Sequence, residues 1–332
     1  MAASDTSAEI ERNGVAHGDA PVAVIGAGSI GSAFALLYAL AGLAVRVYDE
    51  MPDAFDAARK QIRVNLAAMR EAGLTASSDA QVLDLISSAA SLESAVAGVQ
   101  WVQECAPENL ELKCDLFARL DSCAPPGAIL ASSSSAMPAS RFASGLPGEG
   151  RCLVAHPGNP PYLLRVIELV PAGFTERGVL QRAEQFSRRV GLHPVHVGRE
   201  VEGFIFNRLQ GAMLREAYCL VRDGVASVED IDTLVRLGLG LRWSVVGPFE
   251  TVDLNTRGGI ASHAEKLGPA YARMGAERGQ NDPWTPELVA QVSAQRRERL
   301  PLDQWQERVA WRDRALMRRL AGGPVDEPPV DS

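Results

Sequence analysis

Short apolar runs alternate with longer amphipathic stretches over the first two hundred residues of this 332-residue chain. The runs have the length and composition of buried strands, and the stretches between them have the apolar periodicity of helices. Strands and helices that alternate in this way predict a mostly parallel sheet covered on both faces. The expected strands are 21–25, 44–50, 99–105, 128–133, 152–156, 165–170 and 193–198, and the expected helices are 30–42, 52–72, 79–97 in two pieces, 108–124 and 176–191.

The pattern changes after about residue 200, where no further strand is expected. Residues 203–224 form one long helical pattern, and a second helix follows with Ser227 as its N-cap and acids in its first turn. The chain is therefore predicted to be an α/β protein: a Rossmann-like, doubly wound domain precedes an all-helical one. The expected divisions are a disordered leader (1–20), the α/β domain (21–200), the helical domain (201–322) and a disordered tail (323–332).

Composition narrows the class of protein. A net charge of −8 argues against a nucleic-acid-binding protein, and no apolar run approaches the roughly 18–20 residues of a membrane span. The N-terminal segment lacks the basic and apolar regions of a signal peptide. The five cysteines include no C-x-x-C pair and fit neither a zinc site nor a disulfide framework. We expect a cytoplasmic enzyme with reduced thiols and no bound metal.

The segment VIGAGSIG has the G-x-G-x-x-G spacing of a dinucleotide-binding turn, between an expected strand and an expected helix. The first glycine permits a tight turn, the second lets the backbone approach a pyrophosphate, and the third lets helix and strand pack closely. An acid at the end of the next strand can bind both ribose hydroxyls and repel a 2′-phosphate, which favours NAD over NADP. The predicted cofactor residues here are Gly26, Gly28, Ser29, Ile30, Gly31 and Asp49.

Two further segments follow expected strands, at the sheet edge where open parallel sheets bind ligands. QECAPENLELK contains Glu104, Glu108 and Lys113, and the last two could contact the nicotinamide side of the cofactor. They could equally be a helix-capping pair. ASSSSAMP offers the hydroxyls of residues 132–135 to a substrate oxygen, or caps a short helix. Cys105 has no base beside it in sequence and is interpreted as a packing residue.

His156 and Glu168 make the strongest chemical proposal. Oxidation of a secondary alcohol needs a base for the hydroxyl proton, and histidine titrates near working pH. A carboxylate on the other ring nitrogen fixes the tautomer and stabilises the imidazolium. Glu168 interrupts the apolar run VIELV, where a buried charge is costly without a partner. The alternatives are a structural histidine in a turn and an unrelated strand carboxylate.

Taken together, these segments resemble the NAD-dependent L-3-hydroxyacyl-CoA dehydrogenase family over about residues 21–320. Within it the chain is most similar to the lambda-crystallin branch, which includes L-gulonate 3-dehydrogenase. The segments that carry the resemblance are VIGAGSIG with Asp49, QECAPENLELK, ASSSSAMP, AHPGNPPYLLRVIELV and VEGFIFNRLQGAMLREA. The marks of the branch are HPGNPPY, GLGLRWSVVGPFETVDLN and WRD near the C-terminus.

The resemblance implies roles for individual residues. His156 matches the catalytic base and Glu168 its orienting carboxylate. Ser135 matches the serine that binds the substrate oxygen, and Asn207 the asparagine that faces the reacting carbon. Ser133 stands where acyl-CoA enzymes carry asparagine, so the contact to the nicotinamide side stays open. The remaining implied cofactor residues are Asn159, Glu108 and Lys113, and the family implies a homodimer formed through the helical domain.

The substrate is the open question. CoA phosphates would need a basic surface, and Arg59, Arg63 and Arg70 lie roughly on one face of helix 52–72, although a solvated face explains them equally well. A free 3-hydroxy acid needs one cation in the pocket, and Arg242 is the candidate. We favour a free, L-gulonate-like 3-hydroxy acid. The alternatives are a 3-hydroxyacyl-CoA of fatty acid metabolism, a carnitine- or diketone-type substrate, and a non-catalytic crystallin-like structural protein.

Overall fold

The computed structural model describes residues 20–279, 285–305, 307–308 and 311. The predicted tail and all of the predicted leader except residue 20 lie outside these ranges. The chain divides into two compact units, Met1–Met213 and Leu214–Ser332. The boundary predicted near residue 200 stays a prediction, because helix α8 (Phe206–Arg222) begins in the first unit and ends in the second.

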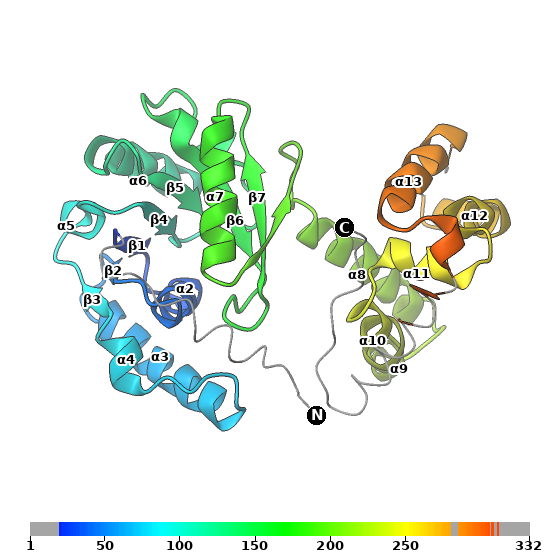
Figure 1. Cartoon of the computed structure of the whole chain (residues 1–332), viewed down its shortest axis with the longest axis horizontal. Coiled ribbons are helices and arrows are strands. Elements are labelled where there is room, and N and C mark those ends of the chain that lie inside the picture. The colour runs from blue at the N-terminus through cyan, green and yellow to red at the C-terminus, as the bar shows by residue number, and fades with distance from the viewer. Residues whose placement is uncertain (1–19, 280–284, 306, 309–310, 312–332) are drawn as a thin grey trace. The chain divides into compact units, whose positions relative to one another are not determined.

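The first unit is built on an eight-stranded sheet with the order β3-β2-β1-β4-β5-β6-β7-β8. All neighbouring strands are parallel except β6 and β7, which form an antiparallel hairpin (Figure 1). This confirms the predicted doubly wound sheet. The strands are β1 (Val22–Ile25), β2 (Val45–Tyr48), β3 (Ile86–Ser88), β4 (Trp101–Glu104), β5 (Ile129–Ser132), β6 (Cys152–Pro157), β7 (Val166–Pro171) and β8 (His193–His196).

One strand was not predicted. The stretch 79–97, expected to be helical in two pieces, contains β3 between two five-residue helices. Ser78 and Ser91 each form a capping box that starts one of these helices. Between them, Ile86 pairs with Val45 of β2, and its side chain is 3% exposed. The segment Ile86–Ser88 therefore extends the sheet at its edge, where Ile86 is buried and both serines stay exposed.

Helices cover both faces of the sheet and enclose one apolar layer on each side. Buried residues of α2, α3, α4 and α7 pack on one face, and those of α5 and α6 pack on the other. Burial on both faces explains why a central strand such as β1 is a continuous apolar run. The helices are α2 (Ser29–Leu40), α3 (Ala54–Glu71), α4 (Asp79–Leu83), α5 (Leu92–Val96), α6 (Leu110–Cys123) and α7 (Arg177–Arg189), with short 3-10 turns η1 (Ala139–Arg141) and η2 (Glu149–Arg151).

The described part of the second unit is helical throughout, as predicted. Ser227 caps its first complete helix by accepting the Asp230 N–H at 3.1 Å. None of the described helices is both long and apolar enough to cross a bilayer. The elements are α9 (Val228–Leu234), the π-helical η3 (Val235–Leu239), α10 (Gly240–Trp243), α11 (Pro248–Asn255), α12 (Gly259–Glu277), α13 (Pro286–Arg299) and η4 (Leu302–Gln304).

Candidate active site

The glycine turn joins β1 to α2, and its three glycines have different reasons to be glycine. A Cβ on Gly26, which has a φ of 99°, would lie 2.7 Å from the Cys105 carbonyl oxygen. A Cβ on Gly31 would lie 1.8 Å from the Gly26 carbonyl oxygen. No heavy atom lies within 4 Å of a Cβ built on Gly28. Gly26 and Gly31 therefore serve packing, whereas Gly28 leaves space beside the α2 N-terminus that fits a pyrophosphate.

Asp49 follows β2 and is held against this turn. Its Oδ2 accepts the Ala27 N–H at 2.7 Å, and its Oδ1 accepts the Met51 N–H at 2.9 Å. The nearby cation, Arg46, is turned away: its guanidinium donates to the carbonyls of Ser94 and Ala97 on the far side of the strand. A fixed carboxylate without a facing arginine suits a free 2′-hydroxyl and disfavours a 2′-phosphate. The turn and its acid thus fit NAD.

His156 and Glu168 face each other across the β6–β7 hairpin. They are directly paired in the antiparallel register, and His156 Nδ1 lies 2.7 Å from Glu168 Oε2. The second carboxylate oxygen accepts the backbone N–H groups of Ile205 and Phe206, at 2.7 and 3.0 Å. These two amides start helix α8, so one carboxylate anchors both the histidine ring and the beginning of a helix.

The surroundings of this pair favour the ionised form of Glu168. Both side chains are buried, with exposed fractions of 7% for His156 and 4% for Glu168. Burial alone would raise the pKa of Glu168, but the hydrogen bonds from His156, Phe206 and Ile205 outweigh it and lower that pKa. An ionised Glu168 requires a proton on Nδ1, so a neutral His156 has its other nitrogen, Nε2, free to accept a proton.

Asn207 and Ser135, two other predicted site residues, contact each other. Asn207 follows the amides that bind Glu168, and its Nδ2 donates to the Ser135 carbonyl oxygen at 2.8 Å. Ser135 itself is exposed, in the loop after β5. Asn159 is exposed in the turn after β6, where its predicted ribose contact stays a prediction. In the same turn, a Cβ on Gly158 would come within 2.9 Å of Val166, so close packing explains that glycine.

The acids of QECAPENLELK are held by neighbouring side chains. Lys113 Nζ contacts both oxygens of Glu104, at 2.8 and 3.0 Å, and the two residues are 1% and 0% exposed. Ser132 donates to the same carboxylate at 2.5 Å. Glu108 instead accepts the Ser134 hydroxyl at 2.5 Å, and its other oxygen lies 3.7 Å from Lys113 Nζ. This cluster ties β4, α6 and the serine loop together.

A signal for the buried lysine was present in the sequence. Lys113 stands three, four and seven residues before Leu116, Phe117 and Leu120, so it shares their buried face of α6. An ammonium group on that face needs an acid, and the strand that ends at Glu104 supplies one. The predicted cofactor contacts of Glu108 and Lys113 stay predictions, and Glu104 joins them as the buried acid that pairs with Lys113.

Cys105 is not a reactive thiol. Burial raises its pKa to about 12, so the thiol stays protonated at neutral pH. Its Sγ lies 3.2 Å from the Ser133 hydroxyl, and Ser133 Oγ accepts the Gln103 amide at 2.8 Å. The predicted packing role of Cys105 fits these contacts.

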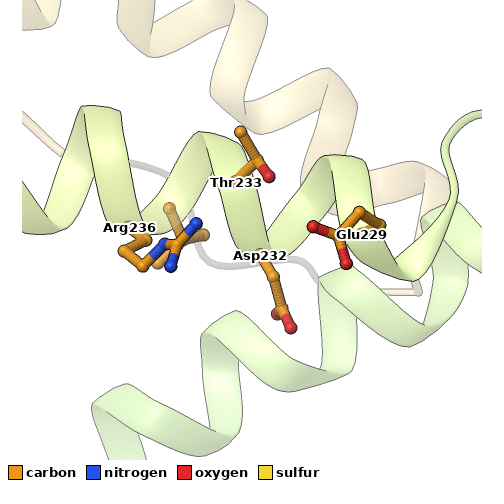
Figure 2. A pocket seen from close by; sticks show the side chains of 5 residues that line it. Glu229, Asp232, Thr233 and Arg236 are labelled. Atoms are coloured by element: carbon orange, nitrogen blue, oxygen red, sulfur yellow. The ribbon is translucent and has the colours of Figure 1, made fainter.

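In the second unit, Arg242 is half-buried on α10, and its contact with a substrate stays a prediction. Another feature of this unit is an open hollow on α9 and η3 (Figure 2). It is lined by Glu229, Asp232, Thr233, Val235 and Arg236, none of them a predicted site residue. Its lining contains two carboxylates and an arginine but no histidine.

Comparison with known proteins decides the family. Residues 21–201 match the 3-hydroxyacyl-CoA dehydrogenase NAD binding domain, and residues 203–299 match the 3-hydroxyacyl-CoA dehydrogenase C-terminal domain. The chain belongs to the NAD-dependent 3-hydroxyacyl-CoA dehydrogenase family. Members of this family are NAD-dependent oxidoreductases that act on CH–OH groups, which agrees with the glycine turn and Asp49.

Individual relatives refine the picture. A lambda-crystallin homolog from Bos taurus is 40% identical over 304 residues, which cover 90% of this chain and 94% of the relative. An L-carnitine dehydrogenase from Streptomyces griseus is 38% identical over 265 residues, covering 80% of this chain and 76% of the relative. A 3-hydroxyacyl-CoA dehydrogenase structure from Archaeoglobus fulgidus is 25% identical with a TM-score of 0.70, covering 91% of this chain and 99% of that one.

Proposed function

We propose that this protein oxidises the 3-hydroxyl of a free L-3-hydroxy acid to the 3-oxo acid, reversibly, with NAD and with His156 as general base. The observation that carries the proposal is the buried contact of 2.7 Å between His156 Nδ1 and Glu168 Oε2. The two amides at the start of α8 hold Glu168 in place. A carboxylate restrained from three directions is what a histidine base needs to keep one tautomer.

The proton step follows from that tautomer. His156 Nε2 takes the proton of the substrate hydroxyl while the C3 hydrogen leaves as hydride, and the C–O bond becomes C=O. When bound, NAD supplies the hydride acceptor. The imidazolium that forms is stabilised by Glu168, whose charge is already in place, so little reorganisation is needed. In the reverse direction, the same nitrogen returns the proton to the developing alkoxide.

Ser135 and Asn207 are proposed to hold the substrate oxygen beside His156. The bond from Asn207 Nδ2 to the Ser135 carbonyl uses one donor of the asparagine and joins the serine loop to the start of α8. That bond leaves the Ser135 hydroxyl at the exposed surface of the loop, where it can donate to an alcohol or ketone oxygen. The roles fit a donor that steadies the oxygen while His156 exchanges its proton.

Two observations favour a free acid over a CoA thioester. On α3, Arg63 and Arg70 both face Asp79, at 3.6 and 2.8 Å, so two of the three arginines considered for CoA phosphates already have a carboxylate partner. Among the relatives, L-carnitine dehydrogenases are named for a free 3-hydroxy acid. Arg242 is proposed as the cation that pairs with the substrate carboxylate. A 3-hydroxyacyl-CoA remains the alternative substrate, since solved structures of that activity share the fold.

A homodimer through the helical domain is also proposed. Helix α8 exposes a row of large apolar side chains, which a second copy of the chain would cover. Light scattering on the purified protein should give twice the chain mass of 35.5 kDa, and a mass of one chain would reject the dimer. The exposed row consists of Leu209, Met213, Leu214, Tyr218 and Val221.

The substrate is tested by following NADH absorbance with L-gulonate, 3-hydroxybutyrate, L-carnitine and 3-hydroxybutyryl-CoA. The proposal expects kcat/KM to be highest for a free acid and to fall at least threefold in Arg242→Met. A preference for the thioester would support the alternative. Arg242→Lys serves as the matched control because it keeps the charge. Tight NAD binding without turnover of any substrate would instead support a crystallin-like structural role.

A further inference from the structure

A buried chain of polar side chains crosses the α2 face of the sheet and ends at the serine loop. Gln103 on β4 is at its centre and is 0% exposed. Its amide oxygen accepts the Tyr38 hydroxyl at 2.9 Å and the Trp101 indole N–H at 3.0 Å. Its amide nitrogen donates to Ser133 Oγ at 2.8 Å. Tyr38 and Trp101 are themselves 0% and 1% exposed, so these bonds are shielded from water.

The hydrogen bonds between these side chains have a fixed direction. An indole N–H can only donate, so the atom of Gln103 that faces Trp101 must be the oxygen, and the nitrogen must face Ser133. The Ser133 oxygen therefore accepts, and its own proton has to point elsewhere. The thiol of Cys105, at 3.2 Å, is a weak acceptor compared with oxygen. A ligand oxygen near Ser133 would be the better acceptor for that proton.

The strand order places such a ligand. Strands β1, β4, β5 and β6 are consecutive neighbours in the sheet. The glycine turn follows β1, and His156 lies near the end of β6. A dinucleotide with its pyrophosphate at the turn and its reactive ring at His156 must cross the ends of β4 and β5. Ser133 directly follows β5, and Cys105 directly follows β4, so both lie on this path.

We propose that Gln103 is a positioning residue that forces the Ser133 hydroxyl to act as a donor, and that this hydroxyl recognises the carbonyl oxygen of the nicotinamide carboxamide. The proposal rests on the proposed function only in requiring that NAD binds across these strand ends. Ser133 then contacts the ligand directly. Gln103, which does not touch the ligand, determines that Ser133 donates in this contact.

The test compares dissociation constants, measured by calorimetry, for NAD and two analogues. Thionicotinamide adenine dinucleotide replaces the carboxamide oxygen with sulfur, a weak acceptor, whereas the 3-acetylpyridine analogue keeps the oxygen and loses the amide N–H groups. The wild-type chain should bind NAD about three- to tenfold more tightly than the thio analogue, the size of one neutral hydrogen bond. Ser133→Ala should bring that ratio close to one and leave the ratio for the acetylpyridine analogue unchanged.

The thio ratio is the dissociation constant of the thio analogue divided by that of NAD. Gln103→Met should also reduce this ratio, because Ser133 is then free to turn its proton back towards the strand. Adding it to Ser133→Ala should cause no further change. If Gln103→Met does not fold by circular dichroism, Gln103→Glu replaces it: the carboxyl still accepts from Tyr38 and Trp101 but lacks the amide donor, so the ratio should again fall. Ser187→Ala removes a buried hydroxyl on α7, whose partner is the Ala183 carbonyl, and should leave the ratio at its wild-type value.

The inference is overturned if Ser133→Ala preserves the thio ratio, if it alters the acetylpyridine ratio instead, or if the folded Gln103 variant binds all three dinucleotides as the wild type does. A wild-type chain that binds no dinucleotide would contradict the proposed function itself. The two failures are therefore distinguishable in one set of titrations, without any measurement of turnover.

Discussion

Glu168→Gln separates the charge of the carboxylate from its role as a hydrogen-bond acceptor. The amide oxygen can still accept the two backbone N–H groups at the start of α8, which now bind Glu168 Oε1. The amide nitrogen then faces His156 Nδ1, where the carboxylate oxygen lies at 2.7 Å. Two donors cannot face each other at that distance, so the imidazole should move its proton to Nε2 and lose its ability to accept from the substrate.

The expected magnitudes differ for rate and stability. The same exchange in a Ser-His-Asp triad lowers kcat about 10⁴-fold, so we expect a loss of about 10³–10⁴-fold here, or roughly 4–5.5 kcal/mol of barrier. Stability should fall less, by about 3 kcal/mol, because three charge-assisted bonds become neutral ones worth about 1 kcal/mol less each. Glu168→Ala should cost more stability than Glu168→Gln, because it removes the acceptor of His156 Nδ1 and of both backbone N–H groups at the start of α8.

Three measurements check this reasoning. Steady-state kinetics give kcat, urea denaturation gives the free energy of unfolding, and ¹⁵N spectra of the histidine ring report which nitrogen carries the proton. The Nδ1-protonated form should dominate in the wild type and the Nε2-protonated form in Glu168→Gln. A Glu168→Gln protein with kcat within tenfold of the wild type, or with an unchanged tautomer, would refute the proposed role of the carboxylate.

Three further predictions concern the fold around the site. Lys113→Met leaves Glu104 charged and buried and should cost about 3–5 kcal/mol in urea denaturation, while adding Glu104→Gln should recover much of that loss. Gly28→Ala should fold normally but weaken NAD binding in a titration, whereas Gly31→Ala should reduce the melting temperature, because its Cβ would lie 1.8 Å from a carbonyl oxygen. The pKa of Glu168 in the folded protein lies below its ordinary value of 4.5. Its contribution to stability is therefore present above pH 4.5 and is lost as the pH falls through the folded pKa. The free energy of unfolding should accordingly decrease less steeply at acid pH in Glu168→Gln than in the wild type.

The sequence allowed the hairpin pair to be predicted because the information was local. His156 and Glu168 stand twelve residues apart around a proline-rich turn, and a charge within an apolar strand requires a nearby partner. The glycine turn was equally predictable, since its spacing follows from steric needs at three positions. The anchoring of Glu168 by the start of α8 was not, because it joins residues 37 and 38 positions apart.

The buried networks at the ends of β4 and β5 escaped prediction for a related reason. Gln103 contacts Tyr38 across 65 residues and Ser133 across 30, and these contacts arise only from the strand order and the register of β4 with β5. Polar residues on buried strands are uncommon and costly without partners, so a glutamine in WVQEC was a signal that a partner existed. The identity of that partner depended on the assembled sheet.

The most direct test of the central claim is the kcat of His156→Ala, measured with NAD and the best substrate of the panel and paired with the NADH dissociation constant. The account predicts that kcat falls by about 10²-fold or more while NADH affinity stays within about twofold, because His156 moves the proton and does not hold the cofactor. An unchanged kcat in a folded His156→Ala protein that still binds NADH would contradict the assignment of His156 as the base.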